Sequence, residues 1–229
     1  MTCEEDAVEK LKAWKGKRLR DSGSFKKRAW SIWVVNILLA TTLFGCGGAR
    51  PSKYYQLTIP GEHVAPPGAD SISATILLGP LFASHLYRED RIVYSGSGEQ
   101  MGTYEYHRWA EPPTEMIQEV LLRELRASSR YKAVYVERSS ASGDFLIRGR
   151  LYDFKEVSGS AMLAKVTFEL EMRDLKSAST VWTHYYTHDE PISGKDVPAV
   201  VAALDRNVQA AVKEMLASLD QYFAEHPFK

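Results

Sequence analysis

The chain has 229 residues, of which 45% are hydrophobic and 25% charged, and its 29 basic residues balance its 29 acidic residues. The charges divide unevenly at Cys46: nine basic and five acidic residues precede it, which leaves 20 basic against 24 acidic residues from Cys46 onward. A mildly acidic chain lacks the basic face that nucleic-acid binding requires, so we expect no nucleic-acid partner.

The first 45 residues have the layout of a leader. Lys26, Lys27 and Arg28 precede a run of about 16 small or apolar residues, which is shorter than the roughly 20 residues that span a bilayer as a helix. A basic stretch followed by a short apolar stretch and small residues is typical of a secretory signal. We therefore expect residues 1–45 to be a leader or signal peptide and exclude them from the fold. The alternative is that the start of the chain is mis-assigned.

The apolar run ends at Leu43-Phe44-Gly45-Cys46, which resembles a bacterial lipobox. In such a motif the cysteine is lipidated and becomes the first residue of the mature chain, although Phe44 is larger than the residue usual at its position. We therefore predict that Cys46 is the lipid attachment site. The alternatives are an uncleaved membrane anchor and a helix of a soluble protein, but such a helix would need a polar face, which this run lacks.

The positions around the two cysteines also bear on location. Cys3 lies in the leader, so the mature chain is expected to contain one cysteine and no internal disulfide. Gly47 follows Cys46, whereas retention at the inner membrane is usually signalled by Asp at that position. We therefore expect a lipid-anchored protein of the cell envelope, in the outer membrane and facing the periplasm, with residues 46–53 as its tether.

Residues 54–229 are expected to form a single domain with a sheet. Aromatic, β-branched or alternating residues predict strands over residues 53–60, 71–80, 131–137, 144–154, 165–173 and 180–188, and two more around the turn at residues 96–98. The last three of the listed ranges alternate apolar and polar residues, which is typical of antiparallel strands with one buried face. In the clearest case, Val166, Phe168, Leu170 and Met172 alternate with Thr167, Glu169 and Glu171.

Two segments have helical periodicity instead. Pro112 and Pro113 suit the first turn of a helix, and the apolar residues after them fall on one helical face. A second helix is expected from Asp196 to about Tyr222, with a continuous apolar stripe and a length of about 40 Å. The order of the elements predicts an α+β fold, in which a mostly antiparallel β-sheet has two helices packed on one face in a single domain.

Three features together resemble those of a known family. Residues 54–57 (YYQL) follow the lipobox cysteine closely, residues 104–113 (YEYHRWAEPP) precede the first helix, and a terminal helix that contains residues 203–216 (ALDRNVQAAVKEML) closes the chain. The combination resembles the ABC-type transport auxiliary lipoproteins, among them the lipoprotein of the paraquat-inducible Pqi system. The resemblance extends over about residues 54–219.

The resemblance implies a periplasm-facing, lipid-anchored accessory subunit of an MCE-type ABC transport system. Such systems move phospholipids or other hydrophobic molecules between membranes, and the implied partners are an MCE-domain protein and the ABC permease and ATPase, with a homo-oligomer as a further candidate. The chain is not the ATPase, because its sequence has no phosphate-binding loop. The alternative is a periplasmic module that itself carries a hydrophobic ligand, which a pocket of several hundred Å³ would favour.

The candidate partner-binding residues are Tyr104, Tyr106 and Trp109, because aromatic residues are enriched at the centres of protein interfaces. Alternation along a strand predicts Tyr104 and Tyr106 on one face and His107 on the other. Trp109 has a second explanation, since a residue between a strand and a helix often packs the helix onto the sheet.

We expect no catalytic residues, no metal site and no cofactor. His184 and His188 would lie about 13 Å apart on a strand, which is too far to share one metal ion. Residues 95–98 are rich in glycine but lack the nucleophile elbow of a hydrolase, and the carboxylates are scattered along the chain. The chain is therefore predicted not to be an enzyme.

Overall fold

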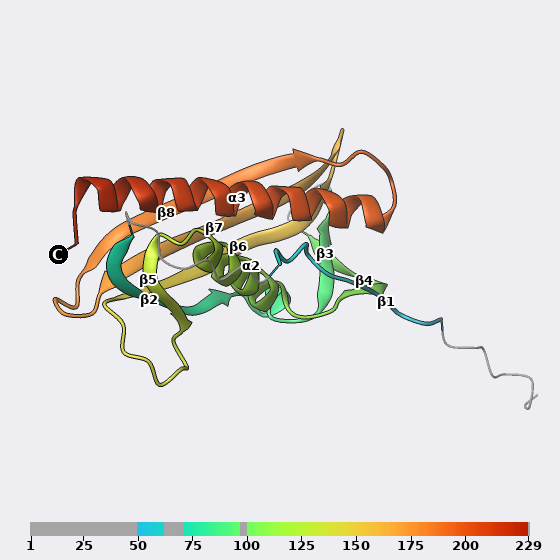
Figure 1. Ribbon diagram of the computed structural model, residues 1–229. Helices are drawn as coiled ribbons and strands as arrows, with labels where there is room; N and C mark the ends of the chain where they lie inside the picture. The colour runs from blue at the N-terminus through green and yellow to red at the C-terminus, as the bar shows by residue number, and fades with distance from the viewer. Residues whose placement is uncertain (1–49, 62–70, 97–99, 229) are drawn as a thin grey trace, which may run out of the picture. The chain divides into compact units, whose positions relative to one another are not determined.

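The computed structural model describes residues 50–61, 71–96 and 100–228, and one compact unit begins at Pro51. In these residues the chain forms eight strands and two α-helices (Figure 1). Their order is β1 (Lys53–Tyr55), β2 (Ile72–Ala83), the short 3-10 helix η1 (His85–Tyr87), β3 (Arg91–Ser95), β4 (Met101–Trp109), α2 (Pro113–Ala127), β5 (Tyr131–Val136), β6 (Phe145–Ser158), β7 (Met162–Asp174), β8 (Thr180–Pro191) and α3 (Val197–Glu225).

The eight strands belong to one sheet, which forks at β6. Nearly the whole of β6 pairs with β7 on one side, and β7 in turn pairs with β8. On its other side β6 pairs first with β2, over residues 145–151, and then with β3, over residues 155–157. β5 lies outside β2, while β4 and then β1 lie outside β3. The long strands β6–β8 therefore carry two branches, one at each end of β6.

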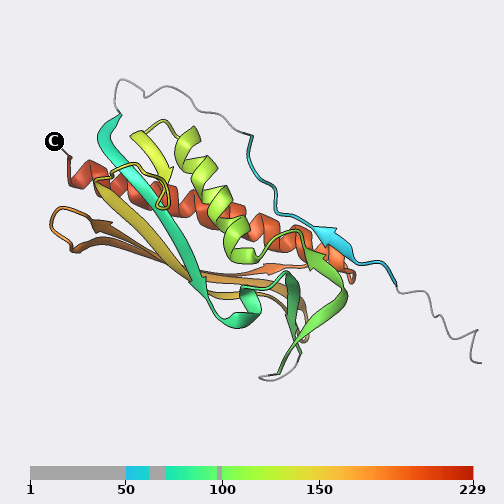
Figure 2. The same cartoon turned by 90° about the horizontal axis from the view of Figure 1, so that it is seen from below.

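The predicted α+β fold class is confirmed. β6, β7 and β8 form the antiparallel meander that their alternating residues predicted, and β3 and β4 form an antiparallel hairpin. The other four pairings, β1–β4, β2–β5, β2–β6 and β3–β6, are parallel, so the sheet is mixed. Both helices lie on the same side of the sheet, with α2 on β2 and β5 and α3 on β6, β7 and β8 (Figures 1 and 2).

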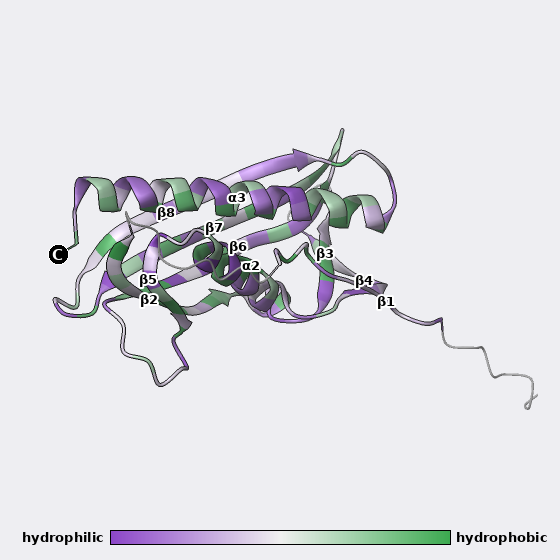
Figure 3. Cartoon of the chain, in the orientation of Figure 1, coloured by the Kyte–Doolittle hydropathy of each residue, from purple (hydrophilic) through white to green (hydrophobic). Residues whose placement is uncertain are grey.

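Both helices begin where the sequence predicted. Pro113 opens α2, and the side chain of Asp196 caps α3 by accepting a hydrogen bond from the main-chain N–H of Ala199 at 3.1 Å. Hydrophilic and hydrophobic residues alternate along α3 in Figure 3, as expected for a helix that buries one face. The buried face contains most of the predicted stripe: Val197, Val200, Leu204, Val208, Ala211, Val212, Met215 and Leu219.

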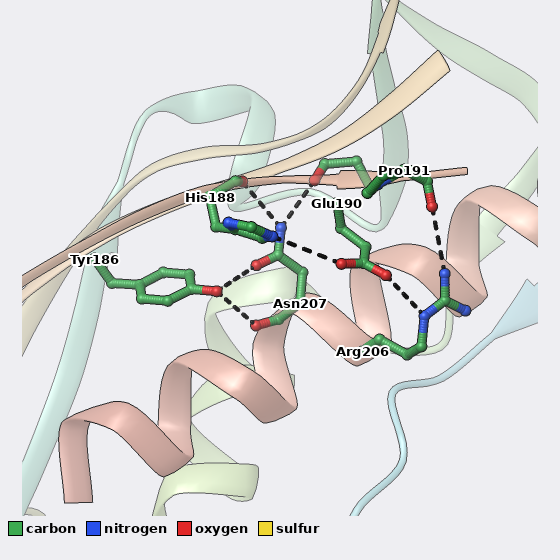
Figure 4. Close-up of polar contacts among 7 residues, drawn as sticks. Tyr186, His188, Glu190, Pro191, Arg206 and Asn207 are labelled. Carbon is green, nitrogen blue, oxygen red and sulfur yellow. Dashed lines mark hydrogen bonds and ion pairs between the residues drawn. The ribbon is translucent and has the colours of Figure 1, made fainter. Parts of the chain in front are cut away.

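One polar side chain lies inside this apolar interface between α3 and the sheet. Asn207 is 1% exposed, and its Nδ2 donates to the main-chain oxygens of Ala164 on β7, at 2.8 Å, and His188 on β8, at 3.0 Å. Its Oδ1 accepts a hydrogen bond from the Tyr186 hydroxyl at 2.7 Å (Figure 4). Because both polar atoms of the side chain are paired, the amide fixes the position of α3 over the two strands.

The predicted first strand is shorter than expected and ends at Tyr55. Beyond it the chain leaves the sheet and lies against the helices, with Leu57 buried. The main-chain N–H and the hydroxyl of Thr58 both donate to Asp205 of α3, at 2.9 and 2.6 Å, and Gln209 donates to the Thr58 carbonyl at 2.8 Å. The side chains of Asp205 and Gln209 thus form the hydrogen bonds with the main chain of Thr58 that a neighbouring strand would form if β1 continued in the sheet.

Candidate partner-binding site

Trp109, the last residue of β4, lies in the core. It is 1% exposed, and its ring centroid is 5.3 Å from that of Phe154 on β6. Its main-chain N–H donates to the Asp90 carbonyl at 2.7 Å, which ties the end of β4 to the turn before β3. The structure therefore places Trp109 in the core against β6, which favours the packing role over a contact with a partner.

Tyr104 is half-buried and contacts a buried carboxylate. Its hydroxyl donates to Glu156 at 2.5 Å, and the Ser158 hydroxyl donates to the second oxygen of the same carboxylate at 2.5 Å. Glu156 is 3% exposed, so these two hydroxyls supply the hydrogen bonds that water gives to an exposed carboxyl group. Burial, and then the hydrogen bond to Glu156, raise the pKa of Tyr104 well above its ordinary value, so that the hydroxyl keeps its proton and remains a donor.

The predicted separation of Tyr104 from His107 is wrong. Their ring centroids lie 6.0 Å apart in an edge-to-face arrangement, and the Tyr55 hydroxyl is 2.8 Å from Nδ1 of His107. The reason is a break in the register between β3 and β4, which changes the side that later residues of β4 face. Tyr106 hydrogen-bonds to Glu105, and this contact raises the pKa of Tyr106. A partner contact at Tyr104 and Tyr106 stays a prediction.

A groove of about 590 Å³ lies beside α2, between that helix and the ends of β2 and β5; we call it the α2 groove. Apolar side chains such as Leu78 line part of it, but nine of its fifteen lining residues are polar or charged. Four of them are glutamates: Glu111, Glu115, Glu119 and Glu137. This lining is unsuited to an acyl chain, which needs an apolar wall. Arg123 and Arg138 offset part of the negative charge, and the excess of glutamates that remains disfavours an anionic headgroup.

The sequence reasoning missed a group of aromatic residues on the side of β2, β6, β7 and β8 that faces away from the helices, which we call the open face. Phe82 is 51%, Tyr152 43% and Tyr185 57% exposed. The rings of Tyr152 and Tyr185 lie 6.3 Å apart, and a hollow of about 220 Å³ adjoins Phe82 and Tyr152. Alternation in β8 could have indicated this, because Tyr185 precedes the buried Tyr186.

The histidines of β8 each have a different neighbour. Nε2 of His184 is 3.3 Å from Glu214 on α3, whereas Nε2 of His188 is 3.6 Å from Glu190. Within residues 50–61, 71–96 and 100–228, no three His, Cys, Asp or Glu residues group closely enough to hold a metal ion. Cys46, the predicted lipidation site, lies outside the described residues.

Comparison with known proteins identifies the family. A family model of the ABC-type transport auxiliary lipoprotein component matches residues 55–216, from the end of β1 into α3. The chain belongs to this family. The auxiliary lipoprotein is thus an accessory component of transport in the cell envelope, and its family is not a known class of enzyme. None of the helices in the described residues is long and apolar enough to cross a membrane. A search of curated proteins finds no match.

Two solved structures share the fold of this auxiliary lipoprotein. Protein XCC0632 from Xanthomonas campestris is 22% identical and has a TM-score of 0.62, with 72% of this chain and 92% of that chain covered. An uncharacterized protein is 12% identical and has a TM-score of 0.60, with 74% of this chain and 99% of that chain covered. At these identities the similarity shows the fold alone.

Proposed function

We propose that this auxiliary lipoprotein is a lipid-anchored, periplasm-facing accessory subunit of an MCE-type ABC transport system, which moves phospholipids or other hydrophobic molecules between membranes. The observation that carries the proposal is the family match over residues 55–216, which spans nearly the whole folded unit. An auxiliary component contributes no ATP hydrolysis, so it acts by contacts with the MCE-domain protein or with the permease and ATPase.

The packing of the domain supports an accessory role over that of a lipid carrier. The apolar faces of α2, α3 and the sheet bury one another, with residues such as Val120, Phe168 and Val208 0% exposed. The α2 groove has the volume of a ligand pocket, but its glutamates make it a poor site for an acyl chain. A domain whose apolar residues already fill its core works through its surface.

The proposed anchor limits where that surface lies. Cys46 carries the lipid in this proposal, and Lys53 begins β1. The seven residues from one to the other span at most about 25 Å when fully extended. The β1 end of the domain therefore stays within about 25 Å of the bilayer surface. In this proposal the bilayer is the outer membrane, and the domain faces the periplasm.

The anchor is tested by replacing Cys46 with Ser in the full chain. We expect the variant to accumulate as an unprocessed precursor and to take up no fatty-acid analogue. Cys3→Ser is the matched control, because it removes the other cysteine of the chain and should leave labelling and processing unchanged. Labelling that persists in the Cys46→Ser variant would rule out this attachment site.

The accessory role is tested by purifying the tagged full chain from native envelopes in mild detergent. Mass spectrometry should identify an MCE-domain protein, a permease and an ATPase in the same complex. The amount of non-covalently bound lipid that solvent extracts should be well below one molecule per chain after the partners are removed. A chain that purifies without these partners and retains one extractable lipid per molecule would instead be a carrier.

A further inference from the structure

A row of four side chains crosses the open face. Phe82 on β2 lies beside Arg150 on β6, Arg150 lies beside Glu169 on β7, and Glu169 lies beside Tyr185 on β8. The two ends of the row are aromatic and its centre is charged. Phe82 and Tyr185 are both more than half exposed, and the burial of aromatic rings makes some of the largest contributions to association.

A second, parallel row repeats the charges, with Arg148 on β6 beside Glu171 on β7. On the open face β6 thus presents two arginines and β7 presents two glutamates. Arg148 pairs with Glu137 at the end of β5 rather than with its neighbour on β7. In the part of the chain that the structure describes, neither Arg150 nor Glu171 takes part in an ion pair. Arg150 and Glu171 are therefore available to a partner, whereas Arg148 is paired with Glu137 and Glu169 accepts a hydrogen bond from the Tyr152 hydroxyl at 2.8 Å. A carboxylate has several acceptor positions, so Glu169 can still receive an arginine of the second copy.

We propose that the open face binds the open face of a second copy of the chain. The two-fold axis lies between the two sheets and runs along the strands, midway between β6 and β7. This axis exchanges the two ends of each row. Arg150 then faces Glu169 of the second copy, Arg148 faces Glu171 of the second copy, and Phe82 faces Tyr185 of the second copy. This inference goes beyond the proposed function and does not depend on it.

The charge pattern selects this axis over the other one that could join the two faces. A two-fold axis along the row, at right angles to the strands, would place Arg150 opposite Arg150 and Glu169 opposite Glu169 of the second copy. Like charges in contact disfavour that arrangement. Read from one end the row is aromatic, base, acid, aromatic, and read from the other end each charge is inverted. A surface of this kind is complementary to itself, which is the requirement for an isologous dimer.

The open face is large enough for a stable dimer. β6, β7 and β8 have 14, 13 and 12 residues, so at about 3.3 Å per residue the face is about 40 Å long. Three strands about 4.8 Å apart give it a width of about 14 Å, and β2 widens it only beside residues 145–151 of β6. The resulting area of about 700 Å² is near the roughly 800 Å² that each partner buries in a stable complex. The hollow of about 220 Å³ is lined mainly by residues of β6 and β7 and reaches Phe82 at its edge, so it lies near the proposed axis and adjoins the position opposite Tyr185 of the second copy.

Charge reversal tests the proposal, with the mass of the detergent-solubilised full chain measured over a range of concentrations. Arg150→Glu and Glu169→Arg each place like charges opposite one another twice in the dimer, so each should weaken dimerisation by about tenfold or more. The chain with both substitutions should regain the parent affinity, because each acid again faces a base. Lys213→Glu is the matched control, since Lys213 is exposed on α3, on the helical side of the sheet, and it should leave dimerisation unchanged.

Cysteine cross-linking tests the same contact within the membrane. Two differently tagged full chains are produced together, one with Phe82→Cys and the other with Tyr185→Cys. Because packed sheets lie about 10 Å apart, beyond the reach of a disulfide, a short bifunctional maleimide should join the two cysteines. Pairing Phe82→Cys with Tyr54→Cys is the control, because Tyr54 is 64% exposed but lies on β1. A parent chain that stays monomeric, dimerisation that tolerates both single reversals, or cross-linking that is equal for the two pairs would overturn the proposal.

Discussion

Replacing Asn207 with Leu should lower the stability of the domain more than any other conservative change on α3. The substitution keeps the volume of the side chain but removes the three hydrogen bonds to Ala164, His188 and Tyr186. At about 1 kcal/mol net for each bond, the loss is about 3 kcal/mol. The Tyr186 hydroxyl, in a residue that is 6% exposed, also loses its best acceptor, which adds about 1 kcal/mol.

The assay is guanidinium unfolding of the unit that begins at Pro51, followed by circular dichroism. A total of about 4 kcal/mol is a large part of the 5–15 kcal/mol that holds a domain of this size together, so the guanidinium midpoint should fall clearly. In a parallel thermal scan, Tm should fall by about 10 °C. Arg206→Ala is a matched control on the same helix, because Arg206 is exposed and its ion pair with Glu190 contributes less than about 1 kcal/mol.

A double-mutant cycle separates the hydrogen bonds from simple packing. Tyr186→Phe alone should cost about 1 kcal/mol, because it leaves the amide oxygen of Asn207 without its donor. In the Asn207→Leu background the same change should cost nothing or restore stability, because the hydroxyl there keeps only the long, 3.4 Å contact to the main-chain oxygen of residue 207, and the coupling should be at least about 1 kcal/mol. Additive effects, or an Asn207→Leu variant as stable as the parent, would refute the reasoning.

Three further changes test other parts of the fold, each measured by urea unfolding. Val208→Asp places an unpaired charge at a residue that is 0% exposed and should cost several kcal/mol; an unchanged midpoint would mean that this face of α3 is not packed on the sheet. Gly149→Ala would bring a Cβ to 2.3 Å from Leu170 and 2.6 Å from a main-chain oxygen of β7, so it should lower the free energy of unfolding by more than about 1 kcal/mol. A smaller loss would show that β7 can move aside. Tyr104→Phe removes a donor from the buried Glu156 carboxylate and should cost about 1–3 kcal/mol, whereas no loss would mean that water replaces the hydroxyl.

The parts of the fold that follow from local periodicity could be predicted. The buried stripe of α3 and the buried residues Val166 and Phe168 of β7 depend on spacings of 3.6 and 2 residues, which any single segment displays. The parallel pairings of β6 with β2 and β3 could not be predicted, because they join segments that are far apart in the sequence. The register break that brings Tyr104 to His107 is non-local for the same reason.

The candidate binding surfaces could be predicted only in part, because they combine local sequence patterns with contacts between distant segments. The aromatic residues around Trp109 could be recognised from the sequence, but the burial of Trp109 depends on Phe154 of a distant strand. Asn207 carries no local signal, since an Asn on a helix is usually exposed, and only the position of β7 and β8 beneath it explains its burial. The row from Phe82 to Tyr185 requires the register of four strands, so no reading of single segments could assemble it.

The direction of the proposed two-fold axis is also compatible with the proposed anchor. β1 belongs to the branch that pairs with residues 155–157 of β6, through β3 and β4, and it lies at that end of the long strands (Figure 1). A two-fold axis along the strands leaves positions along the axis unchanged, so the β1 segments of both copies lie at the same end of the dimer. Each is within about 25 Å of its own Cys46 along the chain. Two lipid anchors at one end can enter one bilayer, whereas a two-fold axis across the strands would send them to opposite ends.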